Sequence, residues 1–199
     1  MRRYIIVFLL SLTLLPISLL GGAPGELFSG APRDDDGRFT NLAGDLSHGT
    51  LSTRFPFMLR RFGTYFRSGK DAPQRIPNDG AFLRENARHS KPTVTWVGHA
   101  TLLVQVEHVT FLTDPIWSNR PSPVPIIGPG RFVEPGLALE DLPPIDFVLI
   151  SHNHYDHLDL PTLRSLSRRS PDTVFFVPLG NGDLLRNQGI TNVKELDWG

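Results

Sequence analysis

The stretch Phe147-Val148-Leu149-Ile150-Ser151 runs directly into His152-Asn153-His154-Tyr155-Asp156-His157. The first five residues are mostly apolar, which is typical of a buried strand. Side chains alternate along a strand, so His152 and His154 would share one side if the strand period continues. The aspartate and the last histidine of the motif lie further along the turn and can face a second centre. The pattern therefore predicts metal ligands at the end of a strand.

The chemistry of the motif favours a divalent metal of borderline softness, such as zinc. His152 and His154 could hold one ion, and Asp156 and His157 a second, with an acidified water between the two. Asp156 would then also act in catalysis, because it would position the attacking water while binding metal. The alternative is a histidine cluster in a solvated loop, although this spacing at a strand end does not easily arise by chance.

Bulk composition limits the possible functions. The chain has 199 residues, which is enough for one domain with a real core. Lys plus Arg is 20 and Asp plus Glu is 20, so the net charge gives no reason to expect nucleic acid as a partner. There is no cysteine. Disulfides, cysteine zinc sites and a lipid-modified cysteine are therefore excluded.

The N-terminus predicts export. Two arginines precede an apolar run from Tyr4 to Leu20, and Gly21-Gly22-Ala23 follows. A basic start, an apolar stretch and small residues are typical of a secretory signal, here over residues 1–23, with a periplasmic or other extracytoplasmic destination. Pro24 would stand at the new terminus, which disfavours cleavage. An uncleaved membrane anchor over residues 4–20 is the alternative, although the run is short for a spanning helix.

Residues 24–92 are interpreted as a linker and N-terminal arm. Gly, Pro, Ser and Asp are frequent in the first part. Within residues 54–67, apolar side chains fall at helical spacing between arginines, which predicts an amphipathic helix. Such a helix could pack on the domain, as apolar stripes usually do, or lie in a membrane interface.

The second part of the chain predicts an α/β domain over residues 93–199. Helices are expected after Asp159, as N-cap, and over residues 181–188. Strands alternating with helices are typical of a layered α/β architecture. Strands are expected over residues 94–97, 101–107, 109–113, 147–151, 173–177 and 193–196.

Several motifs together resemble one family. The chain resembles the metallo-β-lactamase fold superfamily, and within it the N-acyl-phosphatidylethanolamine-hydrolysing phospholipase D branch and its bacterial relatives. The resemblance implies an αββα sandwich, of which residues 93–199 would be the N-terminal half, so that the chain looks truncated after the first half. The segments that carry the resemblance are Trp96–Thr101, Phe111–Pro115, Leu142–Asp146, Ser151–Asp159 and Glu195–Trp198.

The resemblance also implies a ligand set. One zinc ion would be held by His152, His154 and a later histidine, and the other by Asp156, His157 and another late histidine, with a late aspartate between the two. No histidine follows His157 in this chain. We therefore expect the 199-residue chain alone to be inactive or nearly so. The remaining histidines are His48, His89, His99 and His108.

Two further residues are expected to support the ligands. Asp114 closes a strand before Pro115, and a carboxylate there could orient a ligand histidine through its second ring nitrogen. The alternative for Asp114 is a turn-forming aspartate. His99 lies in a Gly-His-Ala-Thr turn and could sit beside the site, or be a structural histidine.

The function that follows is a zinc-dependent hydrolase. The resemblance implies a phosphodiesterase of phospholipase D type, acting on N-acyl-phosphatidylethanolamine or a related phospholipid at a membrane surface, and a possible homodimer. The alternatives are a lactonase or another hydrolase of the same fold, because fold does not decide substrate, and an inactive remnant. Arg120 and Arg131, in the Pro- and Gly-rich segment 118–136, could meet a phosphate, although ordinary surface arginines are the simpler interpretation.

Overall fold

The computed structural model describes residues 30–41, 50–65, 74–122 and 130–197. The chain divides into two compact units, 1–42 with 198–199, and 43–197. In the described part of the first unit, Arg33 and Phe39 form a β-bridge, and the guanidinium of Arg33 lies 4.0 Å from the centre of the Phe39 ring. The segment interpreted as a signal or anchor lies outside the described residues. None of the helices in the described ranges is long and apolar enough to span a membrane.

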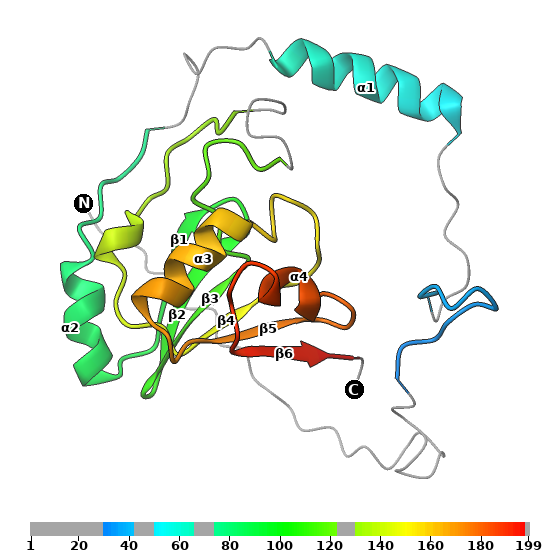
Figure 1. Cartoon of the computed structure of the whole chain (residues 1–199). Coiled ribbons are helices and arrows are strands. Elements are labelled where there is room, and N and C mark those ends of the chain that lie inside the picture. Colours follow the sequence, from blue (N-terminus) through cyan, green and yellow to red (C-terminus); the bar gives the residue numbers. More distant parts are fainter. Residues whose placement is uncertain (1–29, 42–49, 66–73, 123–129, 198–199) are drawn as a thin grey trace, which may run out of the picture. The chain divides into compact units, whose positions relative to one another are not determined.

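The second unit contains the helices and strands (Figure 1). The two helices that precede the sheet are α1 (Leu51–Tyr65) and α2 (Ala81–His89). The remaining elements are β1 (Thr93–Gly98), β2 (Thr101–Val106), β3 (Val109–Thr113), the 3-10 turn η3 (Leu139–Asp141), β4 (Phe147–Leu149), α3 (Leu160–Arg169), β5 (Val174–Pro178), α4 (Gly182–Arg186) and β6 (Val193–Leu196).

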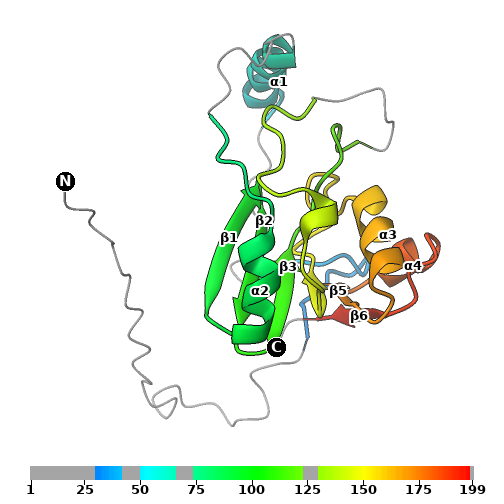
Figure 2. The same cartoon turned by 90° about the vertical axis from the view of Figure 1, so that its left-hand side faces the viewer.

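The six strands form one mixed sheet in sequence order, β1 to β6. β1, β2 and β3 are an antiparallel meander, whereas β4, β5 and β6 continue the sheet in parallel with β3. Helix α3 connects β4 to β5, and helix α4 connects β5 to β6 (Figure 2). The predicted α/β class is confirmed, with every expected strand present. Of the sandwich that the resemblance implies, the described residues form this one sheet.

One face of the sheet forms the core. Leu103, Leu112, Val148 and Phe175 occupy adjacent strands and are fully buried. They share one hydrophobic cluster with buried leucines of all three nearby helices: Leu83 of α2, Leu163 and Leu166 of α3, and Leu185 of α4. Each such side chain contributes roughly 1.5–3 kcal/mol by leaving water. This burial fixes the strand register, because a slip of one residue would turn the whole apolar set outward.

The opposite face of the sheet is apolar but only half-covered. Phe111, Phe147 and Phe176 lie side by side across three strands, with ring centres 4.7 Å and 5.6 Å apart. Trp96 and Val94, on β1, are exposed. The sheet therefore has apolar side chains on both faces, as strands of layered α/β folds do.

One helix prediction needs correction in its bounds, and one helix cap needs more detail. Helix α1 begins three residues earlier than expected, and its side chains Phe55 and Leu59 are exposed rather than packed in the described core. Asp159 is the N-cap residue of α3, as predicted, but its carboxylate accepts a hydrogen bond from the hydroxyl of Thr162 and none from a backbone N–H of that helix. The carboxylate also accepts hydrogen bonds from the backbone N–H groups of Trp117 and Ser118, at 3.2 and 2.9 Å. Because the carboxylate of Asp159 is buried, it needs hydrogen-bond donors, and these two backbone N–H groups supply them.

Candidate metal centre

The sheet topology brings three separate segments to one edge. Leu102 at the start of β2 pairs with Thr113 at the end of β3, and Thr113 pairs with Leu149 at the end of β4. The turn between β1 and β2, the end of β3 and the loop after β4 are therefore neighbours. These segments carry His99, Asp114 and the residues 152–157.

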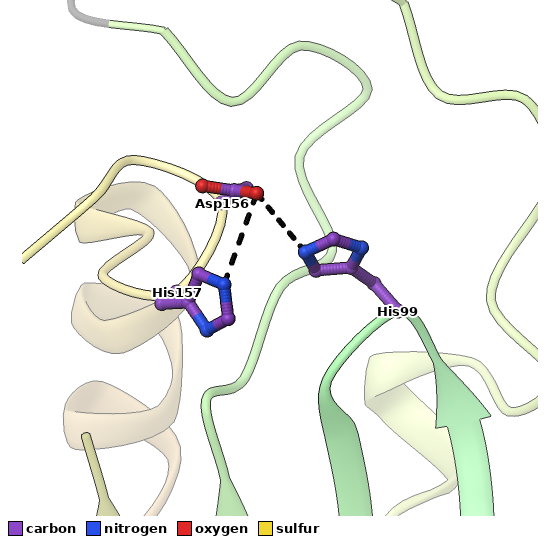
Figure 3. Close-up of side chains that lie close together, drawn as sticks. All are labelled: His99, Asp156 and His157. Carbon is purple, nitrogen blue, oxygen red and sulfur yellow. Dashed lines mark hydrogen bonds and ion pairs between the residues drawn. The ribbon is translucent and has the colours of Figure 1, made fainter. Parts of the chain in front are cut away.

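The first group of side chains is His99, Asp156 and His157 (Figure 3). The Nε2 atom of His99 lies 3.0 Å from Oδ2 of Asp156, and Nε2 of His157 lies 3.8 Å from the same oxygen. One ligand atom from each of the three residues lies within 4.8 Å of the others, which could hold a metal ion. Imidazole nitrogen and carboxylate oxygen are donors that zinc accepts.

The second group is the pair His152 and His154. Nε2 of His152 and Nδ1 of His154 lie 3.1 Å apart. Two nitrogens bound to one tetrahedral zinc ion at about 2.0–2.1 Å lie roughly 3.3 Å from each other, so the observed spacing suits a shared ion. The ring centres of His152 and His157 are 4.0 Å apart, which places the two groups side by side.

A buried carboxylate organises both groups from behind. Asp114 is 6% exposed and adopts a positive φ of 38° at the end of β3. Its Oδ2 atom accepts a hydrogen bond from Nδ1 of His157 at 2.8 Å, and its Oδ1 atom accepts one from the backbone N–H of Ser151 at 2.7 Å. The supporting role predicted for Asp114 therefore has a defined geometry.

Ser151 connects the same carboxylate to His152. Its Oγ lies 2.7 Å from Oδ2 of Asp114 and 2.9 Å from Nδ1 of His152. An ionised carboxylate only accepts hydrogen bonds, so the single hydroxyl proton goes to Asp114, and Nδ1 of His152 must donate to Ser151. His157 must likewise carry its proton on Nδ1. Both histidines are thereby left with a free lone pair on Nε2, the atom that faces the centre.

The electrostatics favour the protonation states that bind metal. Burial, followed by the neighbouring His157 and His154, lowers the pKa of His152. Desolvation raises the pKa of Asp156, but its backbone hydrogen bond and the nearby His157 and His99 outweigh desolvation and lower the pKa. Neutral imidazole and ionised carboxylate are the ligand forms that a metal requires.

A cavity of about 760 Å³ opens beside the centre. His99, His154 and Asp156 lie on its wall, so the two ligand groups are accessible from one space. The apolar part of the wall includes Trp96 and Phe132. A concave apolar site with a few converging polar groups is typical of a small-molecule binding site.

The structure thus brings all the sequence-predicted site residues together. His152, His154, Asp156 and His157 converge, Asp114 lies behind them and His99 touches Asp156 directly. Sequence reasoning missed Ser151, whose position immediately before the motif was the available signal. That these residues bind metal stays a prediction.

Part of the chain is similar to known proteins. Residues 109–199 match the family described as "Beta-lactamase superfamily domain". The chain is 46% identical over 110 residues to N-acyl-phosphatidylethanolamine-hydrolyzing phospholipase D 1 of Caenorhabditis elegans, covering 53% of this chain and 31% of that protein. It is 44% identical over 73 residues to a metal-dependent hydrolase of Anaeromyxobacter, covering 36% of this chain and 23% of that protein. The chain thus spans less than a third of these relatives.

Two solved hydrolase structures are similar to part of this chain. An isothiocyanate hydrolase from Delia radicum gut bacteria is 25% identical with a TM-score of 0.41, over 52% of this chain and 41% of the other. A metallo hydrolase from Ignicoccus hospitalis is 23% identical with a TM-score of 0.39, over 54% and 40% of the two chains. The family match is confined to residues 109–199, and over this stretch the chain is similar to the beta-lactamase superfamily.

Proposed function

We propose that this chain carries the metal-binding part of a metal-dependent hydrolase. His152 and His154 would hold one ion, and Asp156 and His157, with His99 beside them, would hold a second. The observation that carries the proposal is the convergence of ligand atoms in front of one buried acid: Nε2 of His152 lies 3.1 Å from Nδ1 of His154, and Nδ1 of His157 lies 2.8 Å from Asp114. The nitrogen and oxygen donor set suits zinc, which supplies Lewis acidity and lowers the pKa of bound water.

The protein's own groups would orient the reaction. The carboxylate of Asp156 is ionised, lies on the cavity wall and can accept a hydrogen bond from an attacking water. The imidazoles of His152 and His157 are fixed by Ser151 and Asp114, so they need little reorganisation when a ligand binds.

The substrate that we propose is a phosphodiester, as in a phospholipase D-type reaction on N-acyl-phosphatidylethanolamine or a related phospholipid. Support comes from the names of the relatives in Caenorhabditis elegans and in Saccharomyces cerevisiae, where 104 residues are 33% identical. The apolar cavity wall suits a lipid. The exposed aromatic side chains Phe55 and Phe57 of α1 would suit a membrane surface.

The test measures metal and turnover separately. We expect the protein, as isolated from its producing cell, to contain about two zinc ions by mass spectrometry of its metal content. His154→Ala should lose at least one ion, whereas His89→Ala, an exposed histidine on α2 paired with Glu85, should lose none. Metal retained by His154→Ala would contradict the proposal.

Turnover should be measured on the protein as isolated from its producing cell. The panel contains N-acyl-phosphatidylethanolamine, a lactone and a β-lactam. Metal-dependent hydrolysis of the phosphodiester, lost in His154→Ala, would support the phospholipase D assignment. Hydrolysis of the lactone alone would retain the hydrolase and overturn the proposed substrate.

A further inference from the structure

The cavity beside the metal centre has large apolar side chains that face solvent. Ile76 is 86% exposed, Trp96 is 69% exposed and Phe132 is 51% exposed, and all three line the same space. They come from three separate segments of the chain, so their grouping results from the fold. Exposed apolar side chains gathered around one hollow commonly mark a binding surface.

Two arginines line this cavity: Arg75 is exposed, whereas Arg131 is half-buried. Its Nη2 atom donates a hydrogen bond to the carbonyl oxygen of Ile116 at 2.7 Å, which holds the side chain in place. Its Nη1 atom lies beside Gly98, 3.9 Å from where a Cβ atom of that residue would stand. Gly98 directly precedes His99, so this end of the guanidinium lies beside the β1–β2 turn that carries His99.

The charge of Arg131 is incompletely compensated. Burial lowers the pKa of Arg131, while the carboxylates of Glu134 and Asp159 act in the opposite direction from a distance. Within the described ranges no carboxylate oxygen lies within 4.0 Å of this guanidinium, and its buried Nε atom has no hydrogen-bond partner. A partly desolvated cation without an ion pair is costly, and a bound anion would offset that cost.

The shape of the Arg131 guanidinium indicates which kind of anion it would bind. A guanidinium presents a planar fork of N–H donors that matches the oxygens of phosphate and carboxylate. With apolar side chains beside it, the site offers a charged contact and a hydrocarbon contact at once.

We propose that Arg131 binds the anionic group of an amphipathic ligand whose hydrocarbon part packs against Ile76, Trp96 and Phe132. This inference rests on the proposed function and deepens it, because it assigns the recognition of the ligand's charge to one residue outside the metal centre. The ligand class is a phosphate-bearing amphiphile, and a free phosphate is the other possible source of the same chemistry.

The experiment compares three probes by titration calorimetry, with and without chelation of metal. The probes are decyl phosphate below its micellar concentration, the uncharged decyl maltoside, and inorganic phosphate. We expect decyl phosphate to bind at least about tenfold more tightly than inorganic phosphate, because its chain leaves water. Arg131→Gln should weaken decyl phosphate binding by about tenfold or more, with or without metal, and leave decyl maltoside unchanged.

Matched variants keep the result interpretable. Arg131→Lys retains the charge but not the fork, so its affinity should fall between those of the wild type and Arg131→Gln. Arg168→Gln removes an exposed arginine at the end of α3, outside the cavity, and should change nothing. Trp96→Ala should weaken both decyl probes.

Two results would overturn the inference. One is decyl phosphate binding that is unaffected by Arg131→Gln, and the other is inorganic phosphate binding as tightly as decyl phosphate. A failure here is distinguishable from a failure of the proposed function. If the chain binds metal and hydrolyses substrate but Arg131→Gln leaves decyl phosphate binding unchanged, only this inference is contradicted. If the chain binds no metal but binds decyl phosphate through Arg131, only the proposed function is contradicted.

Discussion

His157 and His154 belong to the same six-residue motif, yet the protein holds them differently. The side chain of His157 is 18% exposed, and its Nδ1 atom is fixed 2.8 Å from the buried carboxylate of Asp114. His154 is exposed, and its Nδ1 atom meets only the neighbouring imidazole of His152 among the described residues. The position of His157 is therefore fixed by the fold, whereas the position of His154 would be fixed by a metal ion shared with His152.

Replacing Asp114 should have the largest effect, because it removes the group that fixes His157. Asp114→Ala deletes the acceptor for His157 and for both the backbone N–H and the hydroxyl of Ser151. We expect a loss of roughly 3 kcal/mol in the free energy of unfolding, because several buried donors lose a charged partner. Urea denaturation measures this loss, and metal content should fall with it.

The control for Asp114 has the same chemistry on the surface. Asp183, in α4, has a side chain that is 91% exposed and pairs with Arg186. Asp183→Ala should change the free energy of unfolding by no more than about 0.5 kcal/mol. An equal effect of the two substitutions would mean that Asp114 has no special role behind the histidines.

Replacing His99 tests whether the two ion positions are independent of each other. His99→Ala should lower the affinity for the second ion by about tenfold or more, because His99 contacts Asp156 at 3.0 Å. The ion held by His152 and His154 should be unaffected. Stepwise metal titration of the chelated protein separates the two sites. His108→Ala, whose exposed ring contacts Ser90, is the matched control. A loss of both ions together would show that the centre does not divide as described.

Ser151 should have a smaller effect, mainly at His152, although its hydroxyl also donates a hydrogen bond to Asp114. Ser151→Ala removes the hydroxyl that accepts the hydrogen bond from Nδ1 of His152. Because the ligand itself remains, we expect an affinity loss of about tenfold at the His152–His154 position. Ser151→Thr keeps the hydroxyl and should restore the affinity. Failure of threonine to do so would indicate that the serine acts through its size and not through its hydrogen bond.

Much of this candidate centre can be predicted from the sequence because its candidate ligands are close together in the chain. The motif spacing and the apolar run before it place His152, His154, Asp156 and His157 without tertiary information. Asp114 is also predictable, since an acid at a strand end beside a metal motif has a known use. The strands follow the same logic, because a period of two and flanking turn residues are local signals.

The remaining features depend on contacts between distant segments. His99 and Asp156 are 57 positions apart, and they meet only because the β1–β2 turn lies beside the loop after β4. The sequence predicts Asp159 as a helix N-cap, but not that its carboxylate accepts hydrogen bonds from the backbone N–H groups of Trp117 and Ser118. Arg131 reads as a surface residue, and only the folded loop places it in the cavity wall.

The smallest expected effect concerns pH in the metal-free protein. The folded state lowers the pKa of His152, through burial and the adjacent imidazoles, below the value of about 6.5 in the unfolded chain. The unfolded chain therefore binds a proton at a higher pH than the folded one. The contribution to stability is complete above about pH 6.5 and is lost as the pH falls toward the lowered pKa.

Melting temperatures of the chelated protein between about pH 5 and pH 8 measure this contribution. We expect a small decrease below about pH 6.5 that His152→Gln makes shallower. The lowered pKa of Asp156 acts in a separate window, because its stabilising contribution is lost only in stronger acid. A decrease that is unchanged in His152→Gln would assign the titration to another group. It would also remove the support for a neutral His152 that is ready to receive metal.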